Sequence, residues 1–350
     1  MAIFNFPSTV TSNDQGLTAV CNKHIHTGYR RSHQPWSYYI TSIFQVNNQT
    51  FNVWTHLIGF LFIAEKTRTI SMTFDFIYDD EFRPLGAGLL CISILLIGSS
   101  CAHWFCDQSY CVHYICFFID YSCVGIYAMG CTHVSHCFLV REKQLATFLT
   151  KWSNPVSMYL SLQLTIVFCW TKFRLGMEHK ATKIVQLATV SSFYLWLLVP
   201  LLNRCLSSLN NSNNDEFLGL HQWHVLFAIG NALVYVSHFP ECWFPRTFDI
   251  IGNSHQLHHL LLVATANSFI NATLEEINMA NAYNRQLMKF MTDHLGTISM
   301  SYGSVLFTLV TNCIIIVIAS FKIKCEETKL RRELTLFASN GTQHQNTKKN

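Results

Sequence analysis

Three histidines lie in one short stretch of the sequence, IIGNSHQLHHLLLV at residues 250–263, where a long apolar run begins. His255 and His259 are four residues apart, so in a helix their side chains lie on the same face, one turn from each other. Neutral imidazoles at this spacing can supply two ligands to one zinc ion. His258 is turned by about 100° from His259 around a helix, and we expect it to lie outside such a site.

A second group of polar residues lies in two other apolar runs. Ser99 and His103 are four residues apart near the end of the run at 85–105, and Asp120 lies inside the run at 112–138. A carboxylate within hydrocarbon costs at least about 2.5–3.5 kcal/mol, so it needs a partner, water or a cation. His103 could be a third zinc ligand that leaves a fourth position for water held by Asp120, with Ser99 orienting His103 or facing a substrate. Alternatively, the histidines only bridge helices by hydrogen bonds, with Asp120 paired to one of them.

Membrane-spanning helices are the elements that must position these residues. Half of the 350 residues are hydrophobic and 13% are charged, against about 25% charged residues in soluble domains. This composition predicts an all-α, polytopic membrane protein, and no basic stripe points to nucleic acid. The expected spans are one starting near Asn52 and seven at about 85–105, 112–138, 155–171, 183–202, 218–238, 250–271 and 296–320. They form a transmembrane domain at 52–320, between an N-terminal arm at 1–51 and a basic tail at 321–350.

The order of the spans predicts where the polar residues meet. Even-numbered spans end, and odd-numbered spans begin, on the same side of the membrane. His103, Asp120, His255 and His259 should therefore lie at similar depth. With eight spans both termini share one side, and Lys and Arg, including the four basic residues from Lys172 to Lys183, are more numerous there. Both termini are expected to be cytoplasmic.

Other ionisable residues have weaker claims to a functional site. We expect Glu275 and Glu276 to lie on a solvated face beyond the seventh span. The remaining histidines of the apolar runs are expected to be interfacial or core residues, namely His113, His133, His136, His221, His224 and His238.

The stretch before the first span, GYRRSHQPWSYYITSIFQVNNQTFNVWTHLIGF at residues 28–60, closely resembles that of the progestin and adipoQ receptor family, especially its membrane progestin receptor branch. The residues that match the family pattern here are Asn48, Asn52, Trp54, Thr55, His56 and Leu57, and Gln49 replaces its acidic residue. From the residues alone we expect Trp54 to be interfacial and His56 to make a polar contact at the start of the helix.

The family's other motifs match the polar residues described above. Its Ser-x-x-x-His matches Ser99 and His103, the Asp of its third span matches Asp120, and its His-x-x-x-His matches His255 and His259. The resemblance covers roughly residues 28–320. It implies a seven-helix core with an eighth helix at 296–320, and a zinc ion near the cytoplasmic face bound by the three histidines.

The resemblance leaves two functions open. One is a plasma-membrane receptor for a progestin-like steroid or other lipid, which signals to intracellular proteins. The other is a zinc-dependent hydrolase that cleaves the amide bond of ceramide-like lipids, an activity associated with the adiponectin-receptor branch. In a hydrolase, Asp120 would orient or deprotonate the attacking water, and Ser99 would stabilise the oxyanion or position the substrate.

Overall fold

The computed structural model describes residues 7–15, 22–176, 179–211 and 216–346. These residues form helices and connecting turns, with no strand among them apart from one isolated bridge between Val10 and Tyr29. The prediction of an all-α bundle is confirmed. The helices are α1 (Trp36–Thr41), α2 (Thr50–Ser71), α3 (Arg83–Phe105), α4 (Tyr110–Phe138), α5 (Lys143–Arg174), α6 (Lys180–Leu197), α7 (Val199–Asn211), α8 (Gln222–Ser237), α9 (Ser254–Asn278), α10 (Ala282–Leu295) and α11 (Ser304–Asn346).

A helix is found at each of the eight expected spans, but the number that cross the membrane stays a prediction. In the described part of the chain, four helical segments are long and apolar enough to cross, namely α3, α4, α5 and Ser299–Lys329. Helix α2 carries Glu65, Lys66 and Arg68, and α8 has only 16 residues. All the same, these helices pack into the same body, and α2 contacts α9 through a hydrogen bond from Lys66 to Asn267 (2.6 Å).

The fifth expected span is not one straight helix. The chain bends by 63° between α6 and α7, and the pair counts as a fifth span only if it is taken together. Pro200 lies at the start of α7. A helix tolerates proline in its first turn, whereas in a helix interior the missing N–H and the ring would break or kink it. The span expected at 183–202 is thus formed by two helices with a bend, and whether the pair crosses the membrane stays a prediction.

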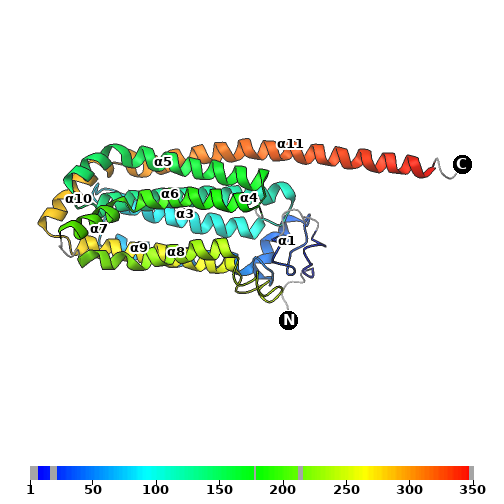
Figure 1. The fold of residues 1–350 in the computed structure, drawn as a ribbon, viewed down its shortest axis with the longest axis horizontal. Coiled ribbons are helices and arrows are strands. Elements are labelled where there is room, and N and C mark those ends of the chain that lie inside the picture. Colours follow the sequence, from blue (N-terminus) through cyan, green and yellow to red (C-terminus); the bar gives the residue numbers. More distant parts are fainter. Residues whose placement is uncertain (1–6, 16–21, 177–178, 212–215, 347–350) are drawn as a thin grey trace.

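The C-terminal part also differs from the expectation. Helix α10 was not predicted; it is short and amphipathic, and it buries Leu287, Met288 and Met291 against the bundle. Helix α11 then runs without a break through residue 320, where the tail was expected to begin. The far half of α11 projects beyond the bundle, at the same end as α1 and the N-terminal arm, whereas α10 lies at the opposite end (Figure 1).

Helices α3 and α4 pack closely through small residues. A Cβ atom on Gly130 would lie 2.5 Å from Cβ of Cys91, and one on Gly88 would lie 2.4 Å from Cγ2 of Val134. Larger residues would not fit there, so the glycines let the two backbones approach, as small residues do between membrane helices. This contact fixes the two helices that carry Ser99, His103 and Asp120.

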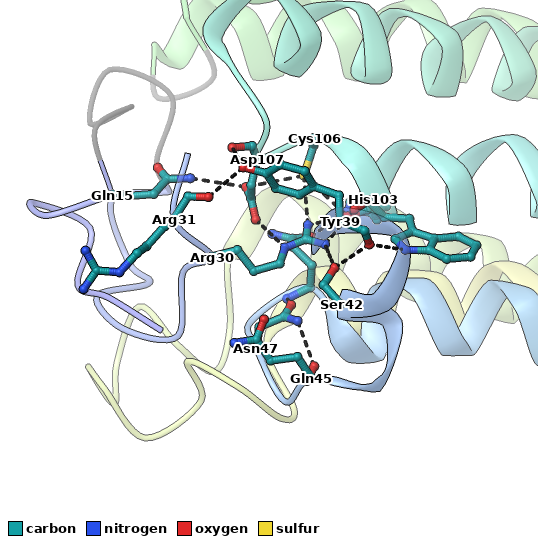
Figure 2. A network of polar contacts seen from close by, with 12 residues as sticks. Gln15, Arg30, Arg31, Tyr39, Ser42, Gln45, Asn47, His103, Cys106 and Asp107 are labelled. Carbon is teal, nitrogen blue, oxygen red and sulfur yellow. Dashed lines mark hydrogen bonds and ion pairs between the residues drawn. The ribbon is translucent and has the colours of Figure 1, made fainter. Parts of the chain in front are cut away.

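The N-terminal arm is fixed to the end of α3 by a buried arginine. Arg30 donates hydrogen bonds to the carbonyl oxygens of His103 (2.9 Å) and Trp104 (2.6 Å), to the Asp107 carboxylate (2.9 Å) and to Oγ of Ser42 (3.0 Å), as Figure 2 shows for the labelled residues. The guanidinium thus satisfies carbonyl groups that a helix C-terminus leaves without an intrahelical partner. The backbone of a candidate metal ligand is held by the arm.

The loop before α9 holds the same arm from the other side. Asp249 accepts hydrogen bonds from the backbone N–H (2.8 Å) and hydroxyl (2.7 Å) of Thr27 and from the N–H of His26 (3.2 Å). The arm therefore bridges the end of α3 and the start of α9, the two places from which the candidate histidines come.

Candidate metal centre

The three histidines at α3 and α9 converge in the structure. His103 lies in the last turn of α3, and His255 and His259 lie in the first turns of α9, which begins where the Asn253 side chain accepts a hydrogen bond from the N–H of Gln256. One ring nitrogen of each histidine lies within 4.8 Å of those of the other two. His103 and His259 are buried, and His255 is half-buried. The expected convergence is found, whereas metal binding itself stays a prediction.

Hydrogen bonds at the far side of two rings select the nitrogen that faces the cluster. Nδ1 of His103 lies 2.8 Å from Oε1 of Gln49, and Nδ1 of His259 lies 3.2 Å from the carbonyl oxygen of Asn52. The Asn52 side chain also donates to Oε1 of Gln49 (2.8 Å), which orients that amide. Oγ1 of Thr55, which donates to the carbonyl oxygen of Phe51, also lies 3.3 Å from Nδ1 of His259. Acceptors at Nδ1 favour the tautomer with the proton on Nδ1 and the lone pair on Nε2.

The geometry of the cluster fits a zinc ion. Nε2 of His103 lies 3.0 Å from Nε2 of His255, and two nitrogen ligands of a tetrahedral zinc lie about 3.3 Å apart. Three imidazoles with acceptors at their outer nitrogens are the donor set that zinc prefers when one position stays open. The residues present therefore fit the metal that the sequence predicts.

His56 is a member of this cluster that sequence reasoning missed. It is buried, and its ring stacks on that of His259 with the centroids 3.7 Å apart and the planes 8° from parallel. It was expected to be a polar contact at the start of the helix, but instead it packs against a candidate ligand. Its position one helical turn after Asn52 was the available signal, because that spacing places both on one face of α2.

A cavity of about 220 Å³ adjoins the cluster. His103 and His255 line it together with His258, whose ring stacks on His255 at 5.8 Å. The expectation that His258 is not a ligand agrees with its absence from the converging group, but it shares the cavity. Residues of the arm, among them Ile25 and Tyr29, line the cavity as well.

Asp120 and Ser99 lie beside this cavity. Asp120 is 8% exposed and lines it, and the Ser99 side chain is a hydrogen-bond partner of the carboxyl group. Ser99 lies next to Asp120, and its expected role in orienting His103 or facing a substrate stays a prediction. Within the described ranges, no hydrogen bond or ion pair joins Asp120 to His103, His255 or His259. The carboxylate therefore faces the cavity rather than pairing with a histidine.

Comparison with known proteins shows which chains this one resembles. The family model described as Haemolysin-III related matches residues 44–270. The chain is 32% identical to membrane progestin receptor alpha of Cynoscion nebulosus over 71% of each chain, and 33% identical to membrane progestin receptor alpha-B of Danio rerio over 69% of this chain and 68% of the relative. It is 26% identical to human membrane progestin receptor gamma over 71% of this chain and 75% of the relative.

The chain belongs to the progestin and adipoQ receptor family. The matched region contains all five candidate site residues, the whole of α3 and α4, and the first part of α9. Together with its apolar helices, membership makes it an integral membrane protein.

One of two neighbouring glutamates in this member of the progestin and adipoQ receptor family differs from the expectation. Glu275 is exposed, as expected for a solvated face, but Glu276 is fully buried. Its carboxylate pairs with Arg204 (2.7 Å), with His221 (3.2 Å) and with Arg141. These residues tie α9 to α7 and to the loop after α4, and their charges suit a structural role away from the three histidines.

Gln49 replaces the acidic residue of the family pattern in this family member. Because it contacts His103, we predict that its replacement changes the affinity for zinc. Gln49→Leu removes the acceptor that holds the ring, and we expect the affinity for zinc to fall about 10- to 100-fold, as for other residues that orient a metal ligand. Gln49→Glu keeps an acceptor at this position and introduces the acidic residue of the family pattern. This variant should bind zinc at least as tightly as the unmodified chain. Chelator competition on purified protein measures both.

The control for this pair is Gln222→Leu, which changes an exposed glutamine at the start of α8. It should leave the affinity unchanged. Equal affinities for Gln49→Leu and Gln222→Leu would show that the Gln49 contact does not orient His103.

Proposed function

We propose that this protein is a plasma-membrane receptor for a progestin-like steroid, which binds in the cavity next to a zinc ion held by His103, His255 and His259. The observation that carries the proposal is the cavity itself, which adjoins the buried histidines. The names of the similar relatives, all membrane progestin receptors, indicate the class of ligand.

The lining of the cavity combines aromatic rings with many polar and ionisable side chains. Aromatic residues contribute part of the wall, among them Tyr29, Phe117, Tyr121 and Tyr235, and amide, histidine and charged side chains contribute most of the rest. The rings can contact the apolar body of a ligand and the polar groups can orient it, and sites for small molecules usually enclose about 300–1,000 Å³. Because this cavity is smaller, entry of a steroid requires side chains or the arm to move, and arm residues form part of the wall.

The proposal includes an orientation with both termini in the cytoplasm. The arm and the projecting part of α11 lie at one end of the bundle (Figure 1). The cavity and the three histidines lie at this end too, because the arm contacts both. Ligand binding there would act directly on the segments that intracellular signalling proteins can reach.

A second candidate function, hydrolysis of ceramide-like amides, is favoured by the placement of Asp120 and Ser99. When bound, zinc would supply Lewis-acid polarisation of a carbonyl and lower the pKa of water. Asp120 faces the same cavity as His103 and His255, so its carboxylate is in a position to accept a proton from water or orient it. Ser99 holds that carboxyl group through its hydrogen bond.

The receptor proposal is tested on cells that express the full chain with a tag at each terminus. Tritiated progesterone should bind and be displaced by unlabelled progesterone. Surface biotinylation should label the protein, and antibodies should reach either tag only after permeabilisation. Cells with an empty vector are the control.

Saturable binding above the control supports the receptor. Its absence in surface-labelled cells would reject a progestin ligand, and a tag accessible on intact cells would reject the proposed orientation.

A further inference from the structure

Lys172 is a buried cation that faces the cavity. It lies in the last turn of α5, its residue is 6% exposed, and its side chain forms part of the wall. The basic residues from Lys172 to Lys183 were expected to flank a span in the cytoplasm, but Lys172 is inside the bundle. In the part of the chain that the structure describes, it has no hydrogen bond or ion pair, and its Nζ lies 3.7 Å from the centre of the Phe117 ring.

An ammonium group in this position lacks the partner that burial demands. Lysine is almost never buried unless it is paired, because the desolvation of its charge is costly. Contact with the face of Phe117, and a longer one to Tyr114 at 6.0 Å, offsets part of this cost. The three donor hydrogens of the ammonium still find no acceptor in those rings.

The other charged groups around the cavity already have partners. Asp107 is paired with Arg30 at 2.9 Å. Lys183 donates to the carbonyl oxygen of Tyr235 (3.1 Å) and contacts His238. Asp120 attracts Lys172 electrostatically but forms no ion pair with it, and it is held by Ser99. A ligand in the cavity can therefore supply the anionic acceptor that Lys172 lacks in the described residues.

We propose that Lys172 binds an anionic group, a carboxylate or a sulfate, at one end of an apolar ligand in this cavity. The proposal rests on the proposed function, since it uses the same cavity. The ammonium can only donate hydrogen bonds, and bonds to ionised acceptors are roughly twice as strong as neutral ones. A site with a buried donor also discriminates against ligands that leave the donor unpaired.

The experiment compares matched ligands that differ in charge, with the purified full chain in detergent. Pregnenolone sulfate is paired with pregnenolone, and oleate with oleyl alcohol, while acetate serves as a free anion. We expect the charged member of at least one pair to bind at least about 10-fold more tightly. Lys172→Met should abolish this preference and Lys172→Arg should retain part of it. Lys180→Met, at an exposed lysine at the start of α6, should retain it fully.

Several results would overturn the proposal. One is that the unmodified chain binds the charged and the neutral ligand of each pair equally. This result does not depend on whether any variant folds. Another is a preference that survives Lys172→Met. Displacement of oleate by acetate at similar concentrations would show that the site takes free anions instead of lipids. If progesterone binds without any preference for charge, the receptor stands and this inference fails. If oleate alone binds and depends on Lys172, the inference stands and the steroid proposal fails.

Discussion

Replacing both His255 and His259 with alanine is expected to lower bound zinc from about one ion per chain to less than about a tenth of that. The two residues supply two of the three nitrogens that converge at the end of α3, and His103 alone cannot hold a zinc ion against water and buffer. Metal analysis of detergent-purified protein by mass spectrometry measures the change. Circular dichroism and gel filtration show whether the helical bundle persists.

The matched control is His258→Ala on the same helix. His258 lines the cavity and stacks on His255, but it is not one of the converging ligands. Its replacement should leave zinc near one ion per chain. A double variant that keeps its full zinc content would reject the three-histidine site, and loss of zinc in His258→Ala would assign that residue a role that the geometry does not give it.

The second large effect is expected for Asp120→Asn. The amide keeps the shape of the side chain and can still bond to Ser99, but it lacks the negative charge that could accept a proton. If the centre is catalytic, release of fatty acid from ceramide by the purified protein should fall at least about 10²-fold, the usual scale for losing a general base. Zinc content and fold should stay unchanged.

Parallel assays on Asp120→Asn separate the possible roles of the centre. If steroid binding is equal with and without the substitution, and neither form hydrolyses ceramide, the zinc only joins helices. Loss of zinc in Asp120→Asn would make Asp120 a ligand or a structural partner. Ser99→Ala, which keeps the carboxylate and removes its hydrogen-bond partner, should have a smaller effect than Asp120→Asn.

The meeting of the three histidines could be predicted because two simple rules determine it. The four-residue spacing places His255 and His259 on one helix face, and the alternation of span direction brings the end of α3 and the start of α9 to the same end of the bundle. Both rules depend only on apolar run lengths and order. The same rules say nothing of side-chain partners, so the contact of Gln49 with His103 had no signal beyond the family pattern.

Features that depend on packing could not be predicted from the sequence. Lys172 and Glu276 each lie near the end of an apolar run, where charged residues usually meet water, yet both are buried. Glu276 is paired with basic side chains from other segments, and Lys172 lies against the Phe117 ring. The bend between α6 and α7 lies within one continuous apolar run, so hydropathy does not reveal it. Helix α10 has too few apolar residues to be counted as a span, and its packing becomes visible only in the folded bundle.

The bonds between the arm and Asp249 have a consequence for how the protein is made. They join residues 222 and 223 positions apart in the chain, so the arm leaves the ribosome long before its second attachment exists. Until α9 has been synthesised and inserted, the arm is attached only to the end of α3, through Arg30. His103 then does not yet have His255 and His259 beside it. The attachment of the arm and the histidine cluster are therefore completed late in synthesis, in the same step that brings α9 into the bundle.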